Sequence, residues 1–353
     1  MSLLKGNNPV CSHPQSSTLC NRQPRGRPRA LPARGFTPAI LSLVLFLSTL
    51  LSAGSACAGD NSILILLSGN DDVYLDVATT ITNSTIKLCR NRSLACQDTN
   101  FEISQISSLD KPLAQNYRLI VTLGIKAAVY AKENLADNLT LSALIPQSSN
   151  ILSATQASDS DQYYFYLDQS LHRSMALISA LSDRFKNIGV MISDTDDASA
   201  RRLEASAYKL DLNLHLEKIN SAKHIGTSLN RLLQSVDILL AVPDTKIHNK
   251  STVSNILISA YRKRIPLIGF SSAYVKAGAL AAVYTSPEDI AYHVRDNIAK
   301  IYSGENIEGK EQTAKYFTVL FNSDVARSLD FPIKSESELT EKMVRISKDD
   351  DHD

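Results

Sequence analysis

The amino-acid sequence predicts an α/β protein made of two doubly wound parallel-sheet lobes, with a hinge and an interlobe ligand cleft. Two observations carry this prediction. Short apolar runs alternate with longer amphipathic segments, which is the pattern of strand–helix units in a parallel sheet. A polar stretch, Gln147 to Asp161, interrupts the pattern, which then starts again. The 353 residues allow two such domains, at about 100–200 residues each.

The first block begins with Ile63 to Leu67, five consecutive apolar residues that are typical of a strand buried on both faces. Ser68-Gly69-Asn70 ends this strand, and Asp71-Asp72 are suited to cap a helix that runs to about Leu88. The other elements predicted in this block are strands at 101–106, 118–124 and 141–145 and a helix at 127–135.

The second block repeats the alternation. Its predicted helices span 167–185, 197–210, 223–233, 252–262 and 287–302. Its predicted strands span 187–193, 212–216, 236–242, 265–270, 280–284 and 315–321. The tail from Lys334 ends in a run of acidic residues, and we expect it to be frayed.

Residues 1–58 are predicted to be a targeting segment that exports the chain. Arginines precede an apolar run from Ala39 to Leu51, and small residues follow it, so the three parts of a secretory signal peptide are present. Ala56-Cys57-Ala58 fits the cleavage site, which places the cut between Ala58 and Gly59. An uncleaved anchor and a lipoprotein attached through Cys57 are the alternatives. A translation start nearer Arg34 than Met1 is a further possibility.

The charge of the chain is divided unevenly. Residues 1–58 hold six of the 37 basic residues and none of the 36 acidic ones, so the remainder has a formal net charge of −5. A weakly acidic chain lacks the basic surface that nucleic-acid binding needs. We therefore expect no nucleic-acid partner.

Two of the five cysteines, Cys89 and Cys96, lie beyond the predicted leader. Two cysteines seven residues apart in an oxidising compartment indicate a disulfide, and the polar residues between them are suited to a turn. Two free thiols are the alternative. No histidine lies near them, so a metal site is not expected.

Enzyme signatures are missing from the sequence. It contains no dinucleotide-binding glycine motif, P-loop, nucleophile elbow or zinc-protease motif, and its seven histidines have no ligand spacing. We expect neither a catalytic residue, a metal nor a cofactor.

The candidate ligand-binding positions are the ends of the predicted strands. At the carboxyl edge of a parallel sheet, glycine allows close approach of the backbone, and helix N-termini present free N–H groups. Ordinary helix capping is the alternative at each position. The candidates are Ser68-Gly69, Thr122-Leu123-Gly124, Ser193-Asp194, Pro243-Asp244 and Phe270-Ser271-Ser272.

Residues 261–283, YRKRIPLIGFSSAYVKAGALAAV, resemble a conserved stretch of the ABC-type substrate-binding proteins with a type I periplasmic binding fold. The similarity is to the branch that binds aromatic amino acids such as tryptophan. The strand at 236–244 and the segment YFTVLFNSDVARSL at 316–329 also resemble that branch.

The resemblance implies a division of the chain into two lobes crossed three times. Lobe one is then 59–160 plus 285–305, and lobe two is 161–284 plus 306–332. Residues 333–353 form the charged flexible tail.

The resemblance also implies a ligand site formed by both lobes. Phe270 and Tyr274 would stack on a planar ligand, with packing at the cleft edge as the alternative. Asp194 and Asp244 are the candidate partners for an ammonium group. The full set is Ser68, Gly69, Thr122 and Gly124 from lobe one and Ser193, Asp194, Asp244, Phe270, Ser271 and Tyr274 from lobe two.

These features predict a periplasmic solute-binding protein that captures a small organic ligand, such as an amino acid, for an ABC importer. We expect a monomer that partners a permease or another inner-membrane protein. The alternative function is a binding-protein-like sensor or accessory module that works with a membrane receptor without transport. Catalysis is the least favoured of the three.

Overall fold

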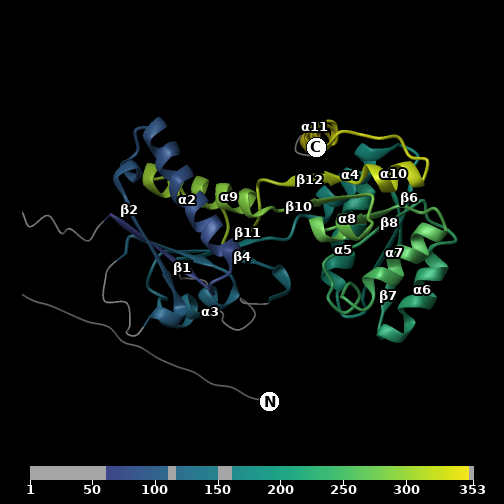
Figure 1. The fold of residues 1–353 in the computed structure, drawn as a ribbon, viewed down its shortest axis with the longest axis horizontal. Helices are drawn as coiled ribbons and strands as arrows, with labels where there is room; N and C mark the ends of the chain where they lie inside the picture. Colours follow the sequence, from purple (N-terminus) through teal and green to yellow (C-terminus); the bar gives the residue numbers. More distant parts are fainter. Residues whose placement is uncertain (1–60, 110–116, 150–160, 350–353) are drawn as a thin grey trace, which may run out of the picture. The chain divides into compact units, whose positions relative to one another are not determined.

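The computed structural model describes residues 61–109, 117–149 and 161–349 (Figure 1). The predicted signal peptide and its cleavage site lie outside the described residues. Within the described part of the chain, no helix is both long and apolar enough to span a bilayer.

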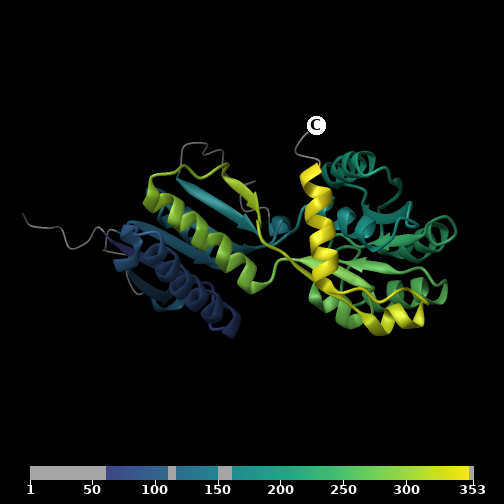
Figure 2. The ribbon, with the colours of Figure 1, turned by 90° about the horizontal axis from the view of Figure 1, so that it is seen from above.

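The first sheet has six strands in the order β11-β5-β4-β3-β1-β2, and all of its paired strands are parallel. Its strands are β1 (Ser62–Leu67), β2 (Asn100–Gln105), β3 (Leu119–Leu123), β4 (Thr140–Ile145), β5 (Gln162–Tyr166) and β11 (Glu311–Thr313). The helices that belong with it are α2 (Asp72–Asn91), α3 (Ile125–Asn134) and α9 (Pro287–Ser303), with short 3-10 turns η1 (Ala95–Asp98), η2 (Ile106–Ser108) and η3 (Gln147–Ser149). Figure 2 shows α9 beside α2, although the two helices are far apart in the sequence.

The second sheet has six strands in the order β12-β10-β9-β8-β6-β7, parallel except for the antiparallel pair of β10 and β12. Its strands are β6 (Asn187–Ser193), β7 (Asn213–Ile219), β8 (Ile238–Leu240), β9 (Leu267–Gly269), β10 (Ala281–Tyr284) and β12 (Thr318–Phe321). The remaining helices are α4 (Leu171–Leu181), α5 (Asp197–Lys209), η5 (Ala222–His224), α6 (Ile225–Leu232), α7 (Val253–Arg262), α8 (Ser272–Ala277), α10 (Ser323–Ser328) and α11 (Glu336–Asp349). We call each sheet with its helices a lobe.

Both faces of the second sheet are buried, as in a doubly wound fold. Along β6, Val190 and Ile192 belong to one apolar cluster and Met191 to the cluster on the opposite face. Successive side chains of a strand point to opposite faces, so this strand reads as a continuous apolar run rather than an alternating one. The apolar run at Ile63–Leu67 has the same cause in the first sheet, where all five residues are buried.

Local signals set the ends of the helices. At α9, the Ser286 hydroxyl accepts from the backbone N–H of Asp289, and the Asp289 carboxylate accepts from the N–H of Ser286. Pro287 occupies the first turn, and Gly304 ends the helix with φ of 78°. This capping box and left-handed glycine fix the helix to the residues that the sequence predicted, to within one position.

Two predicted elements were wrong. The helix expected at 167–185 is preceded by an unpredicted strand, β5, and begins only at Leu171. The tail that was expected to be flexible contains α11, which lies against the second lobe (Figure 2). Its Leu339 and Met343 are fully buried in the core of that lobe. Leu339, Met343 and the partly buried Ile346 form an apolar stripe at helical spacing, which docks a helix whose other face is mostly polar.

The lobe boundaries also differ from the predicted ones. Strand β5 lies in the first sheet, so that lobe extends beyond residue 160 to Tyr166. Strand β11 lies in the same sheet, so the last crossing follows Thr313 rather than residue 305. Helix α9 packs on the first lobe, and β12 joins the second sheet.

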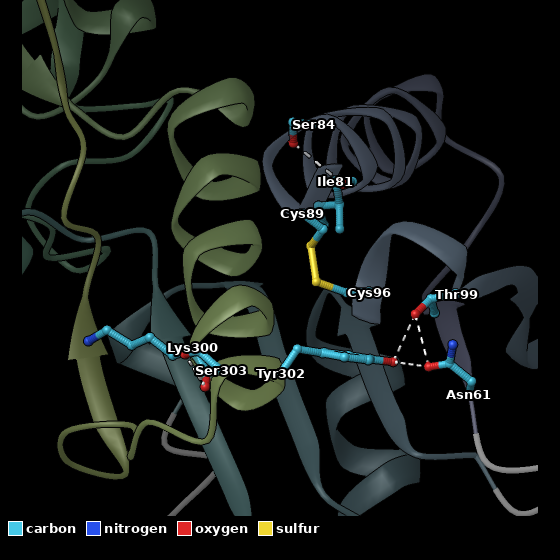
Figure 3. The surroundings of a disulfide bond; sticks show 9 residues. All are labelled: Asn61, Ile81, Ser84, Cys89, Cys96, Thr99, Lys300, Tyr302 and Ser303. Atoms are coloured by element: carbon cyan, nitrogen blue, oxygen red, sulfur yellow. Dashed lines mark hydrogen bonds between the residues drawn. A yellow bond between two sulfur atoms is a disulfide. The ribbon is translucent and has the colours of Figure 1, made fainter. Parts of the chain in front are cut away.

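The predicted disulfide between Cys89 and Cys96 is present and joins the end of α2 to η1 (Figure 3). Both cysteines are buried. Next to it, the hydroxyl of Thr99 donates to Asn61 Oδ1 over 3.1 Å, and the Tyr302 hydroxyl from α9 contacts both residues at 3.0 Å. These contacts hold η1 and the start of β1 against α9.

Candidate functional site

A carboxylate, Asp244, organises the carboxyl edge of the second sheet. Strands β6 and β8 are parallel neighbours, so the residues that follow them meet at one edge. The backbone N–H and the hydroxyl of Ser193 both donate to Asp244 Oδ2, over 2.7 and 2.6 Å. The N–H of Lys246 donates to Oδ1 over 3.0 Å. Asp244 is therefore held rigidly by three hydrogen bonds, as a preorganised site requires.

An aromatic cluster adjoins this carboxylate. The backbone N–H of His248 donates to the carbonyl of Asp244, and its Nδ1 lies 2.6 Å from the Tyr274 hydroxyl. The rings of His248, Phe270 and Tyr274 contact one another with centroids 5.1–6.0 Å apart. Burial lowers the pKa of His248 to about 4, although the charge of Asp244 opposes the shift. The ring is therefore neutral near pH 7.

A cavity of about 340 Å³ opens at this edge, within the size range of small-molecule sites. Its apolar wall includes Leu167, Leu171, Phe270 and Val283, and its polar groups include Asp168, Asp244 and His248. Among the described residues that line it, the charged side chains are two carboxylates, and none is a lysine or arginine. The cavity combines apolar surface with negative charge. We call it the central cavity.

A larger cavity of about 850 Å³ shares five residues with the central cavity, Asp168 among them. Arg202 and Lys209 of α5 line this larger space. Burial raises the pKa of the Asp168 carboxyl, while the N–H of Gln147, its own N–H and the charge of Arg202 act against the rise. The Gln147 N–H donates to Asp168 Oδ2 over 2.5 Å.

The first-lobe candidates gather around one glycine. The backbone of Gly124 has φ of 91°, and a side chain there would meet Ser68 Oγ and the Tyr74 hydroxyl. Ser68 Oγ accepts from the N–H of Ala127 at the start of α3, while Gly69 is half-buried beside Tyr74. Thr122 is fully buried, and its hydroxyl donates to Ser142. None of these candidates lines either cavity described above.

Of the second-lobe candidates, Asp244 and Phe270 line the central cavity. Ser193 and Tyr274 are buried directly behind them and hydrogen-bond to cavity residues. The Ser271 hydroxyl caps α8 by accepting from the N–H of Tyr274, and Asp194 is exposed outside both cavities. The structure thus brings together the candidates that follow β8 and β9, but it packs Tyr274 against His248 rather than into the cavity.

Three chain segments cross between the sheets, and hydrogen bonds join them. Gln169 Nε2 donates to the Thr285 hydroxyl over 2.5 Å and to the carbonyl of Tyr316 over 3.3 Å. The Thr285 hydroxyl donates to the carbonyl of Leu167 over 2.7 Å, and Arg173 Nη1 donates to that of Ala314 over 3.0 Å. The crossings therefore form one hydrogen-bonded bundle beside the central cavity.

The sequence reasoning missed Asp168, His248 and the other cavity residues between β4 and α4. The sequence does contain a signal for Asp168. The aromatic-rich segment Gln162–Tyr166 is a strand, and Asp168 follows its end, where ligand-binding residues are expected. His248 lies four residues beyond a recognised strand-end aspartate, and only the turn between them brings it to the cavity.

Two α/β lobes, three crossings and a cavity at the strand ends are the features of a two-lobed small-molecule-binding protein. Among the described residues, no group of side chains is arranged to hold a metal ion.

The chain belongs to the ABC transporter substrate binding protein family, whose model matches residues 113–342. The predicted resemblance to this family is thereby confirmed. A search of curated proteins finds no match.

Two of the following solved structures share the fold, and the third is similar at a lower TM-score. A substrate binding protein with adhesive properties from Clostridium difficile, in its ligand-free, open form, is 17% identical with a TM-score of 0.60, over 79% of this chain and 97% of that one. The XylFII–LytSN complex gives 12% identity and a TM-score of 0.50, over 74% and 98%. The ABC domain in complex with L-Trp from Streptococcus pneumonia gives 18% and 0.47, over 79% and 98%. At these identities the likeness concerns the fold alone.

Proposed function

We propose that this chain is exported to the periplasm, where it captures a small organic ligand in the central cavity and presents it to an ABC importer. The observation that carries the proposal is the central cavity itself, which lies at the strand ends of the second sheet and beside the three crossings. Ligands of doubly wound sheets bind at that edge. Family membership supplies the importer as the partner class.

Ligand capture is proposed to involve hinge motion of the lobes about the crossings. The three crossings are short segments without helix or strand, and such segments absorb the dihedral changes of domain closure. No covalent chemistry is part of this function, since the family comprises substrate-binding proteins.

Thermal-shift screening of residues 59–353 tests the proposal. The panel holds amino acids, amino alcohols, simple amines, nucleosides and small carboxylates. A ligand present at 100 times its dissociation constant stabilises the folded chain by about 2.7 kcal/mol, or about 5 °C in melting temperature. If no member of the panel shifts the melting temperature, ligand capture of this kind is contradicted.

A sensor or accessory role is the second candidate, and it is favoured by a solved structure of similar fold, the XylFII–LytSN complex, because that structure holds two named components. Uptake of a radiolabelled ligand by a deletion strain separates the two. Transport predicts that uptake falls and returns with the intact gene, whereas a pure sensor leaves the initial uptake rate unchanged.

A further inference from the structure

The central cavity and the larger cavity adjoin each other, and their charges differ. Five residues line both cavities and form the border between them: Ser148, Asp168, Gln169, Leu171 and Pro243. Among the described residues, the charged side chains that line the central cavity are the carboxylates of Asp168 and Asp244. Arg202 and Lys209 line only the larger cavity. A ligand that occupies both cavities therefore meets negative charge in one and cationic side chains in the other.

Arg202 of α5 presents its guanidinium to the larger cavity. The residue is exposed and lines that cavity. Its Nη2 donates to the Ser199 hydroxyl over 3.2 Å, and Ser199 also lines the cavity. Its charge acts on the carboxyl of Asp168, a third lining residue, where it opposes the rise in pKa. Within the described part of the chain, no carboxylate is ion-paired with Arg202. The guanidinium is therefore placed to bind an anionic group of a ligand.

Two more charged side chains, Asp196 and Lys209, line the larger cavity. Asp196 Oδ1 accepts from the N–H of Ser199 over 3.0 Å, so this carboxylate caps α5. Lys209 lies about two helical turns beyond Arg202 along the same helix. Arg202 is the cation whose charge reaches the border residue Asp168. It is therefore the candidate anchor for an anionic group that enters from the central cavity.

The two carboxylates of the central cavity favour a cationic group. Asp168 and Asp244 are both half-buried and line the cavity. The donors to Asp244, which are the N–H and hydroxyl of Ser193 and the N–H of Lys246, are uncharged and leave its negative charge in place. Burial raises the pKa of the Asp168 carboxyl, so a cation beside it would stabilise its ionised form. Both carboxylates are therefore suited to hold an ammonium group.

We propose that the ligand is an extended zwitterion, with its ammonium group at Asp168 and Asp244 in the central cavity and its carboxylate on Arg202 in the larger one. The inference rests on the proposed function and narrows its ligand class to ω-amino acids, in which an apolar chain separates the two charges. Leu171 and Pro243 at the border suit that chain. An α-amino acid carries both groups on one carbon, so it holds them side by side instead of in separate cavities.

The first test titrates pairs of isomers into residues 59–353 by calorimetry. δ-Aminovalerate is paired with L-norvaline, and ε-aminocaproate is paired with L-norleucine. The members of each pair contain the same atoms, but only the ω-amino acid separates its charges. The better of the two ω-amino acids is expected to bind at least about tenfold more tightly than its α isomer, because the isomer loses one charge-assisted contact.

The second test uses variants of α5. Arg202→Gln is expected to weaken binding of the better ω-amino acid about tenfold to a hundredfold, because the contact with its carboxylate is lost. The same variant should bind the matching alkylamine, which has no carboxylate, like the wild type, whereas a merely structural role of Arg202 would weaken both. Arg201→Gln is the matched control, since Arg201 is exposed and lines neither cavity. Asp168→Asn should give the mirror result, with weaker binding of the alkylamine and unchanged binding of the matching alkanoate.

Four results would overturn the inference: equal or tighter binding of the α isomers, unchanged affinity for the ω-amino acid in Arg202→Gln, an equal loss in Arg201→Gln, or binding of neither ω-amino acid. In each case the proposed function stands if another compound of the screening panel stabilises the chain. It falls together with the inference only if no compound of the panel does.

Discussion

Replacing Gly124 by alanine should destabilise the protein strongly, and the structure gives the reason. Gly124 precedes α3 with φ of 91° and ψ of 169°, a conformation that is essentially restricted to glycine. An alanine Cβ would also stand 2.6 Å from Ser68 Oγ and 2.8 Å from the Tyr74 hydroxyl. Both side chains would have to move.

Two costs combine in Gly124→Ala. Backbone strain in this region costs about 1–3 kcal/mol. Displacing Ser68 breaks the hydrogen bond from the N–H of Ala127, which is worth about 0.5–1.5 kcal/mol. The free energy of unfolding should therefore fall by about 2–4 kcal/mol, measured by urea denaturation with an unchanged slope.

Gly69→Ala is the matched control, because it changes a neighbouring glycine in the same way. Gly69 lies outside the left-handed region, and an added Cβ would meet its nearest atoms at ordinary distances of 3.8 and 3.9 Å. We expect a change of less than about 1 kcal/mol. Equal effects of the two substitutions would refute the reasoning, and so would a change below about 0.5 kcal/mol in Gly124→Ala.

Three further predictions concern stability. Leu339→Ala should lower the unfolding free energy by about 2–5 kcal/mol, because Leu339 is buried. The control Val344→Ala, on the exposed side of α11, should have little effect. Similar effects of the two substitutions would mean that α11 is not docked. The double substitution Cys89→Ala and Cys96→Ala should cost about 2–3 kcal/mol by the chain-entropy model, and reductant should lower the melting temperature of the wild type only. Burial holds the pKa of His248 and His293 at about 4, below the value of about 6.5 in the unfolded chain. On acidification the unfolded chain therefore binds protons first. The free energy of unfolding should fall as the pH drops from about 6.5 to 4, by at most about 3 kcal/mol per histidine. Urea denaturation at pH 7, 5.5 and 4 measures this, and a chain that gains stability on acidification would contradict it.

The sequence predicted most of the strands because a parallel sheet covered on both faces leaves continuous apolar runs. The run at Ile63–Leu67 and the segment containing β6 are examples. Strand β5 was missed because its pairing is partly long-range. It lies between β4 and β11, and β11 is a three-residue strand that follows almost 150 positions later in the sequence. Helix α11 was missed because its charged residues outnumber the three apolar residues that dock it.

Some of the candidate residues lie at the central cavity and others do not, for a related reason. Asp244 and Phe270 directly follow recognised strands, so the topology alone brings them to one edge. His248 and Asp168 reach the central cavity through a turn and a crossing segment, whose paths local sequence patterns do not specify. The first-lobe glycines were recognised as special, but the structure shows that the close approach at Gly124 is to Ser68 and Tyr74.

The most direct test of the account is calorimetric titration of the best ligand from the screen into Asp244→Asn and Asp194→Asn. Both remove one negative charge near the strand ends, but only Asp244 lines the central cavity, while Asp194 is exposed outside it. The account predicts that Asp244→Asn weakens binding by at least about tenfold, since a charge-assisted contact is worth about 1.5–3 kcal/mol, and that Asp194→Asn binds like the wild type. Unchanged binding by a folded Asp244→Asn, or a loss confined to Asp194→Asn, would contradict it.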